Sequence, residues 1–280
     1  MSGTTRRQGS RAEGGDVERG SRRVRIAAVG DLHFDATQQG TLLDLFSAVN
    51  TQADILALCG DLTTHGEPVH MRAFVKELGG VEMPIVAVLG NHDHEHDAAA
   101  EVSAILMERG VHVLDGGQVV IQGIGFAGAK GFAGGYGRGA LAPFGERLIK
   151  DFVSAAIEEA IKLETALRTL TTDVKVVLMH YSPVVDTLVG EPEYVYPFLG
   201  SSRLLEPLET HGATVIFHGH AHNGRLEGRT PSGVPVFNVA LPLLRKHGML
   251  FRVWETPAPE RRRAPQPAAA GGEREEGAAA

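Results

Sequence analysis

The sequence has a single cysteine, Cys59, and no long hydrophobic run. One cysteine excludes an intrachain disulfide and agrees with a reducing compartment. No apolar stretch approaches the roughly 20 residues that a membrane-spanning helix needs. The first 23 residues contain arginines but no apolar core, so they do not resemble a secretory signal. We therefore expect a cytoplasmic protein without a membrane span.

The chain also lacks an excess of positive charge. Its formal net charge is −7 at pH 7, from 27 Lys and Arg residues against 34 Asp and Glu residues. Binding to nucleic acid depends largely on neutralising phosphates with basic side chains, so this balance argues against a nucleic-acid partner. A small phosphate ester held by metal ions is still compatible with it.

Large apolar side chains are almost missing from both ends of the sequence. Residues 1–23 are rich in Gly, Ser and Arg, and residues 256–280 are rich in Pro, Ala, Glu and Arg. Such segments cannot bury enough surface to offset the entropy lost on ordering. We predict a disordered N-terminal tail (1–23), one folded domain (24–255) and a disordered C-terminal tail (256–280).

Within the predicted domain, short apolar runs alternate with amphipathic stretches. The amphipathic stretches are 41–51, 67–78 and 98–109, and the runs that predict buried strands are 24–29, 54–58, 84–89, 174–179, 214–217 and 234–239. Strand, helix and strand in succession predict parallel βαβ units. The segments 111–127 and 234–254 predict strands without intervening helices. We therefore expect an α/β fold with a mixed sheet.

Polar residues follow these predicted strands at regular intervals. Asp61 lies 30 residues after Asp31, and Asn91 lies 30 residues after Asp61. Because one βαβ unit is about 30 residues long, all three are predicted at the carboxyl ends of successive parallel strands. That edge is where open α/β sheets bind ligands. Histidines follow two later strands in the same way, at His180 and at His220 and His222.

Each of these motifs alone has an ordinary structural explanation. A histidine near a strand end is commonly a hydrogen-bonded residue, and a Gly-Asp pair is commonly a turn. Five such motifs at the strand ends of one predicted sheet indicate a shared site instead. Carboxylates and imidazoles together suit divalent first-row metals such as manganese, iron or zinc.

The ordered set resembles the motifs of the calcineurin-like metallophosphoesterase family. The family pattern D-x-H, G-D, G-N-H-D/E, H and G-H-x-H reads here Asp31-Leu32-His33, Gly60-Asp61, Gly90-Asn91-His92-Asp93, His180 and Gly219-His220-Ala221-His222. Every element is present in order, between residues 26 and 222. The resemblance implies mixed β-sheets packed as a sandwich and flanked by helices, with a metal site at the carboxyl ends of the strands.

The same resemblance implies two divalent metal ions, with manganese, iron and zinc as candidates. Asp61 would bridge the two ions through its two oxygens. Asn91 would contribute a neutral oxygen, and its amide hydrogens can donate to a substrate oxygen. The implied ligands of one ion are Asp31, His33 and His222, and those of the other are Asn91, His180 and His220.

The resemblance also implies a mechanism, in which a hydroxide that bridges the metals attacks phosphorus in line. His92 would then donate a proton to the leaving oxygen, and we expect Asp93 to orient His92 and keep it cationic. His94 and His96 match nothing in the family pattern, so we expect them in a solvated loop at the mouth of the site. His218 is expected to share a strand face with the last motif and to support it.

Two of the motifs bear on the substrate class. The stretches 60–66 (GDLTTHG) and 90–93 (GNHD) differ from the G-D-x-x-D-R-G and G-N-H-E of protein Ser/Thr phosphatases. They are closer in style to bacterial cyclic-AMP-type phosphodiesterases, so we expect a small phosphodiester, with a phosphomonoester as the alternative. DNA-end nucleases share the core motifs, but the acidic balance argues against them. A non-catalytic scaffold is a further alternative, against which the complete ligand set argues.

Two segments are candidates for substrate specificity. The glycine-rich segment 130–145 contains Tyr136 and Arg138, which are expected to meet a base or a phosphate unless the segment is a plain connection. The segment 184–203 is long, carries aromatic residues and follows His180. We expect it to form a lid or an oligomer contact.

Overall fold

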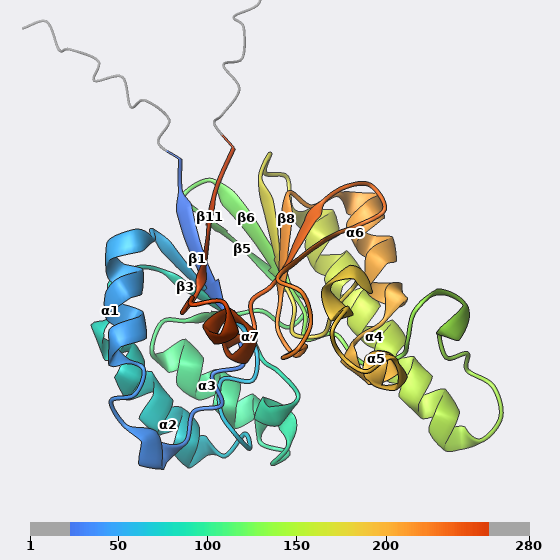
Figure 1. Ribbon diagram of the computed structural model, residues 1–280, viewed down its shortest axis with the longest axis horizontal. Coiled ribbons are helices and arrows are strands. Elements are labelled where there is room, and N and C mark those ends of the chain that lie inside the picture. Colours follow the sequence, from blue (N-terminus) through green and yellow to red (C-terminus); the bar gives the residue numbers. More distant parts are fainter. Residues whose placement is uncertain (1–22, 258–280) are drawn as a thin grey trace, which may run out of the picture. The chain divides into compact units, whose positions relative to one another are not determined.

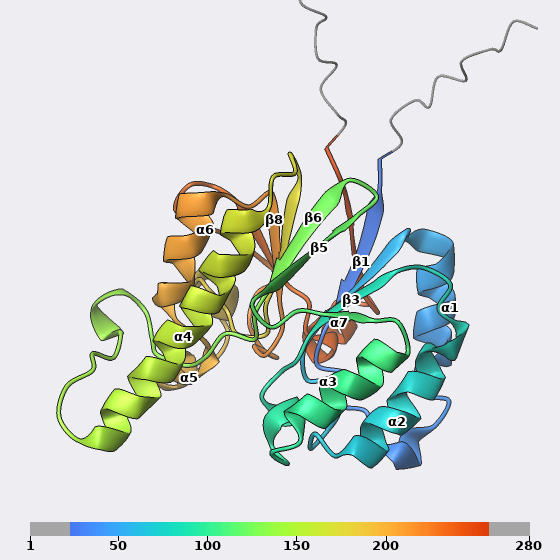
Figure 2. The same cartoon turned by 180° about the vertical axis from the view of Figure 1, so that it is seen from behind.

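The computed structural model describes residues 23–257, and the folded unit within them is Val24–Thr256 (Figure 1). The predicted tails, except for their inner ends, lie outside the described residues. Two β-sheets form the centre of this unit, and helices lie on both sides of the pair (Figures 1 and 2). The expected α/β sandwich with mixed sheets is therefore confirmed.

The first sheet has five strands in the order β11-β1-β2-β3-β4. Strands β1 to β4 are parallel, and β11 is antiparallel to β1. Helices α1, α2 and α3 connect the parallel strands and lie on the outer side of this sheet (Figure 2). The elements are β1 (Arg25–Val29), α1 (Leu43–Gln52), β2 (Ile55–Cys59), α2 (Pro68–Glu77), β3 (Ile85–Val88), α3 (Ala99–Glu108), β4 (His112–Val113) and β11 (Arg252–Glu255).

The second sheet has six strands in the order β5-β6-β7-β8-β10-β9. Its central strands are parallel, whereas β5 and β9 are antiparallel edges. Helices α4 and α6 cover its outer side (Figure 1). The elements are β5 (Gly117–Ile121), β6 (Ile124–Gly128), α4 (Arg147–Thr169), β7 (Lys175–Leu178), α5 (Tyr196–Leu199), α6 (Leu205–His211), β8 (Val215–His218), β9 (Glu227–Arg229), β10 (Pro235–Asn238) and α7 (Leu241–Lys246).

Short 3-10 helices complete the connections. They are η1 (Ala36–Gln38), η2 (Leu78–Gly80), η3 (His92–His94), η4 (Gly137–Gly139), η5 (Asp186–Leu188), η6 (Glu193–Val195) and η7 (Ser202–Leu204). Among residues 23–257, no helix is both long enough and apolar enough to cross a bilayer.

The structure differs from the sequence-based expectation in three places. The motifs follow strands of two sheets, not of one. Helix α7 interrupts the segment 234–254, where only strands are expected; a short apolar run does not distinguish a buried helix from a buried strand. Helix α4 is absent from the expected elements, although it is the longest helix described. It is amphipathic and buries Leu163, Ala166 and Leu167 against the second sheet.

One hydrophobic cluster joins the facing sides of the two sheets. It includes Leu58 and Val88 from the first sheet and Phe126 and Phe217 from the second, all of them fully buried. Packing of this density leaves little freedom for one sheet to slide over the other. The carboxyl ends of β1, β2, β3, β7 and β8 are thereby held in fixed relative positions.

We predict that residues 24–256 form a unit that needs neither tail. Val24 and Thr256 close the β1–β11 pair, since Thr256 N donates to Val24 O at 3.0 Å and Val24 N donates to Thr256 Oγ1 at 3.0 Å. A protein of residues 24–256 should unfold at the same temperature as the full chain. One of residues 24–255 should unfold a few degrees lower, because each lost hydrogen bond costs about 1 kcal/mol. A much lower unfolding temperature for residues 24–256 would show that residues outside this range stabilise the domain.

Candidate metal centre

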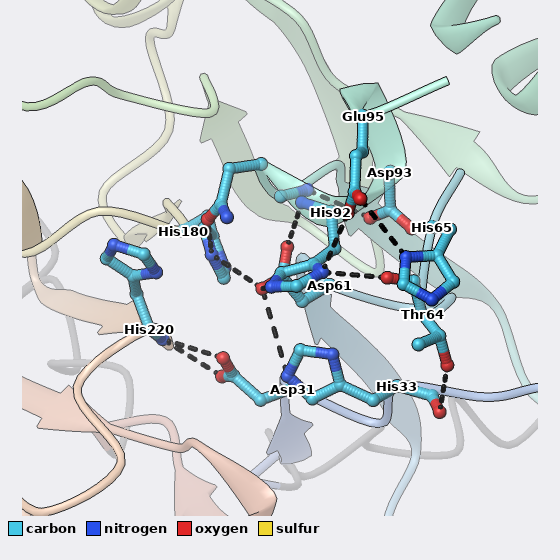
Figure 3. A network of polar contacts seen from close by, with 12 residues as sticks. Asp31, His33, Asp61, Thr64, His65, His92, Asp93, Glu95, His180 and His220 are labelled. Carbon is cyan, nitrogen blue, oxygen red and sulfur yellow. Dashed lines mark hydrogen bonds and ion pairs between the residues drawn. The ribbon is translucent and has the colours of Figure 1, made fainter.

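The expected ligands all lie at strand ends, and both sheets contribute (Figure 3). Asp31, Asp61 and Asn91 closely follow β1, β2 and β3. From the second sheet, His180 comes after β7, and His220 and His222 come after β8. Residues that are up to 191 positions apart in sequence are in hydrogen-bond contact here, as in the pair His222 and Asp31. The structure thus brings the predicted set together.

The backbone at these residues is unusual. Asp31, His33, Asp61 and His220 have positive φ angles of 55°, 43°, 48° and 69°. Left-handed backbone is costly for residues other than glycine and is kept where the surroundings enforce it. Here Asp31 N donates to Gly60 O at 2.9 Å, and His33 N donates to Asp61 O at 3.0 Å. The strand-end turns are therefore locked in the conformation that aims these side chains inward.

Two motif glycines leave room for the carboxylates. A Cβ atom at Gly90 would collide with Asp61 Oδ1, and one at Gly219 would collide with Asp31 Oδ2. Both contacts would be far shorter than real Cβ atoms make. The glycines of G-N-H-D and G-H-x-H are thus required by the close approach of a buried carboxylate.

One side of the site is formed by Asp31, His33 and His222, whose ligand atoms lie within 4.8 Å of one another. His222 Nε2 is 2.9 Å from Asp31 Oδ1. His33 Nε2 is buried and has no hydrogen-bond partner among the described residues. Burial lowers the pKa of His33, which favours the neutral ring. A neutral, buried imidazole nitrogen without a partner is in the state that a metal ligand requires.

The other side is formed by His180, His220 and Asn91. The ligand atoms of His180, His220 and Asp61 lie within 4.8 Å of one another. His180 Nδ1 is 3.0 Å from Cys59 O, to which it donates, so Nε2 is left facing Asn91 Oδ1 at 2.9 Å and Asp61 Oδ2 at 3.3 Å. His220 Nε2 is 3.2 Å from Phe198 O, which leaves Nδ1 as its free nitrogen.

These contacts favour a proton or a metal ion at His180 Nε2. Two acceptor oxygens converge on this nitrogen, and either species makes the arrangement favourable. Burial lowers the pKa of His180, but the Asp61 carboxylate outweighs this effect and raises the pKa to about 9. Burial raises the pKa of Asp61, but His180 and His92 together hold it below its ordinary value. The donor set of carboxylates, imidazoles and one amide oxygen fits two divalent metal ions.

Asp61 lies between the two sides, although it is oriented differently from our expectation. Its Oδ1 accepts the backbone N–H of His92 at 2.8 Å. Its Oδ2 faces His180 Nε2 at 3.3 Å and His33 Nε2 at 3.9 Å. One oxygen, not two, therefore faces both groups of ligands, because the loop after β3 occupies the other.

His92 faces the site with one nitrogen and the protein with the other (Figure 3). Its Nε2 is 4.0 Å from Asp61 Oδ2. Its Nδ1 is 2.7 Å from the Thr64 carbonyl oxygen, to which it donates, and 3.3 Å from Glu95 Oε2. His65 Nδ1 lies 3.2 Å from Glu95 Oε1. The ring of His92 is therefore oriented from its outer side by a backbone carbonyl and a carboxylate.

Asp93 does not have the expected contact with His92. Among residues 23–257 no hydrogen bond joins them. The buried Asp93 carboxylate accepts from Gly90 N at 2.9 Å, from Leu62 N at 3.1 Å, and from Thr63 N and Oγ1 at 2.9 and 2.8 Å. The side chain turns back into the loops after β2 and β3 and ties them together. Its influence on His92 is therefore exerted through the backbone.

The two segments expected to carry specificity pack against each other. Gly134 N donates to Pro197 O at 2.8 Å, and Gly135 N donates to Gly200 O at 2.9 Å. The Tyr136 hydroxyl donates to Ser182 O at 2.8 Å, so this hydroxyl is engaged with the protein's own backbone, and burial raises its pKa. Arg138 lies exposed in η4. The segment 184–203 contacts the metal-site residue His220 through Phe198 O.

Three further histidines near the site, which are not proposed ligands, differ in burial. His218 is buried, donates from Nδ1 to Gly219 O at 2.7 Å and accepts from Thr187 Oγ1 at 2.8 Å, and burial lowers its pKa to about 4. It therefore supports the last motif as a neutral ring. His96 is exposed, as expected. His94 is also exposed, as expected, and lines a cavity beside α3.

Sequence reasoning missed the groups that orient His92. Glu95 stands three residues after His92, a spacing that brings side chains together in a helical turn, and this signal was available. Thr64 acts through its carbonyl group, which has no side-chain signature.

Comparison with known proteins agrees with the fold. The family described as calcineurin-like phosphoesterase matches residues 24–224. A phosphopantetheinyl hydrolase from Mycobacterium tuberculosis has a similar structure, with a TM-score of 0.60 and 14% identity over 90% of this chain and 100% of that one. No curated protein matches the sequence.

Two further structures are similar at a TM-score of 0.50 and 15% identity. One is the protein TT1561 of Thermus thermophilus, where the match covers 85% of this chain and 100% of that one. The other is a putative 5′-nucleotidase from Staphylococcus aureus, where it covers 78% and 48%. At such identities these likenesses concern the fold alone. On the family match, this chain belongs to the calcineurin-like phosphoesterases, and it is a metal-dependent hydrolase of that family.

We predict that Gly90→Ala empties the metal centre. The added methyl group would displace the Asp61 carboxylate, so bound metal per folded chain, measured by elemental analysis, should fall well below that of the unaltered protein. Gly79→Ala is the matched control, because a Cβ atom there meets nothing within 4 Å. Full metal content in a folded Gly90→Ala protein would contradict the role given to this close approach.

Proposed function

We propose that this protein hydrolyses a small phosphate ester, preferably a phosphodiester, at a centre of two divalent metal ions. The observation that supports this most is the position of Asp61 Oδ2, which faces imidazoles on both sides within 4 Å. His92 Nε2 lies 4.0 Å from the same Asp61 oxygen. A bridging carboxylate flanked by an additional, non-ligand imidazole is an arrangement suited to phosphoryl transfer.

The assignment of residues follows the two sides of the site. Asp31, His33 and His222 would hold one ion, Asn91, His180 and His220 would hold the other, and Asp61 would serve both. Such ions, when bound, neutralise charge on the phosphate and activate water for attack on phosphorus. Carboxylate, imidazole and amide ligands favour manganese, iron or zinc. The amide nitrogen of Asn91 is left to donate to a phosphate oxygen, because its Oδ1 faces His180.

His92 is proposed to hold the proton that the leaving oxygen takes up. Its Nδ1–H is committed to the Thr64 carbonyl, which fixes the tautomer and leaves Nε2 toward the site. Glu95 Oε2, at 3.3 Å from the same Nδ1, holds the ring from its outer side. Glu95 is thus a positioning residue, in the role that the sequence suggested for Asp93. Asp93 keeps the loops that carry Asp61 and His92 in register.

The preference for a diester rests on motif style and not on the shape of the site. The sequences GDLTTHG (60–66) and GNHD (90–93) are closer to bacterial cyclic-AMP-type phosphodiesterases than to protein phosphatases. The net charge of −7 makes a nucleic-acid substrate unfavourable. We therefore propose a small-molecule diester as the substrate class.

Two chromogenic esters test this proposal. With manganese, bis(p-nitrophenyl) phosphate should be hydrolysed with a higher kcat/KM than p-nitrophenyl phosphate. The reverse order would favour a phosphomonoesterase. Metal binding without turnover of either ester would leave the scaffold alternative as the better description.

We predict that His92→Gln slows hydrolysis without removing metal. The rate should fall by about 10²–10⁴ for an ester with an alkoxide leaving group, because general acids contribute about this much. The loss should be smaller for p-nitrophenolate, which hardly needs a proton. His96→Gln is the control and should change either rate by less than about threefold, because His96 is exposed and lies 4.0 Å from Glu67, outside the site. Equal losses for both leaving groups, or loss of a metal ion, would overturn the assignment.

A further inference from the structure

A cavity of about 190 Å³ lies beside α3. Its lining includes Leu89, His94, Ser103, Asp115 and Lys130. Liquid water occupies about 30 Å³ per molecule, so the cavity has room for a group of about six non-hydrogen atoms. None of the steps proposed above uses this space.

The cavity is built on the same chain segments as the proposed metal ligands. Leu89 directly precedes the Gly90-Asn91 turn, and His94 belongs to the 3-10 turn that begins at His92. The Lys130 carbonyl accepts the backbone N–H of His180 at 3.0 Å. The cavity therefore lies next to the chain segments that carry Asn91, His92 and His180.

Lys130 is the charged group of this lining that has no ionic partner. Its Nζ donates to Gly131 O at 2.8 Å, and no carboxylate of the described residues lies within ion-pair distance of it. An ammonium group has three N–H donors, so two of them are left. Nζ also lies 5.0 Å from the Phe132 ring centroid and 5.2 Å from that of Tyr181. Such ring contacts stabilise a cation but supply no hydrogen-bond acceptor.

The nearby carboxylates are already engaged. Glu159 accepts from Gly131 N at 2.8 Å and from Lys162 Nζ at 2.9 Å. Asp115 accepts from the same Lys162 Nζ at 2.7 Å. Burial lowers the pKa of Lys130 and Glu159 only partly offsets this, so the ammonium group is poorly compensated where it stands. A bound anion would relieve that desolvation.

Tyr181 connects Lys130 to the metal centre. Its ring centroid is 5.2 Å from Lys130 Nζ and 4.4 Å from the ring centroid of His220. The ammonium group and a proposed metal ligand thus contact the same aromatic ring, so both lie within reach of one small molecule.

We propose that Lys130 binds a second anionic group of the substrate in this cavity while the ester phosphate lies at the metal centre. The substrate class is then a small phosphate ester that carries an additional carboxylate or phosphate. This inference rests on the proposed function and narrows it. Lys130 is a specificity-determining residue, which contacts the substrate away from the reacting atoms.

A matched pair of diesters tests the proposal. Glycerophosphoserine and glycerophosphoethanolamine both carry the amine and differ by one carboxylate. The unaltered protein should prefer glycerophosphoserine by at least about tenfold in kcat/KM, the usual worth of a charge-assisted hydrogen bond. In Lys130→Met the ratio should fall to near one, and in Lys130→Arg a preference should persist. Lys150→Met, an exposed lysine of α4, should keep both the ratio and the rates.

Inhibition of bis(p-nitrophenyl) phosphate hydrolysis gives a second measurement on the unaltered protein. O-phosphoserine should compete at a concentration at least about tenfold lower than O-phosphoethanolamine, for the same charge-assisted hydrogen bond. This inhibition measurement tests the role of the second anionic group even if Lys130→Met fails to fold or if neither diester is turned over. Hydrolysis of the chromogenic ester without either preference would overturn this inference alone. No hydrolysis of any ester would overturn the proposed function and this inference with it.

Discussion

Two buried carboxylates, Asp31 and Asp61, both lie near His33 and contact imidazoles that follow strands of both sheets, and the site is organised around this concentration of charge. Buried charges are tolerated only with partners of opposite charge or with bound cations. Holding these carboxylates in place also requires unfavourable backbone conformations. Four residues of the site have left-handed backbone: Asp31, His33, Asp61 and His220. Glycines are needed where a carboxylate comes closest to the backbone. A binding site for cations explains why these costs are accepted.

Both sheets contribute residues to this site. The first supplies the acidic residues and Asn91 from three adjacent parallel strands, and the second supplies His180, His220 and His222. The common core holds the two edges together, while buried polar groups fix the loops that leave them. Asp93 ties the loops after β2 and β3, and His218 supports the turn after β8.

Much of this architecture could be predicted from the sequence, because strands and strand-end motifs leave strong local patterns. Apolar runs located β1, β2, β3, β7, β8 and β10 to within about two residues. The division into two sheets could not be read from apolar runs, since it depends on long-range pairing. Contacts of individual side chains were also beyond reach: Asp93 turns away from His92, Tyr136 bonds to Ser182, and Thr64 acts through its backbone. Rotamer and loop geometry, not residue type, decide such contacts.

The most direct test of the central claim is anomalous X-ray scattering from crystals of the manganese-loaded protein. If Asp61 Oδ2 serves both sides of the site, two metal peaks should lie about 3.5–4 Å apart with this oxygen between them. One peak should be bounded by Asp31, His33 and His222, and the other by Asn91, His180 and His220. A single peak, or a second metal that has no contact with Asp61, would contradict the account.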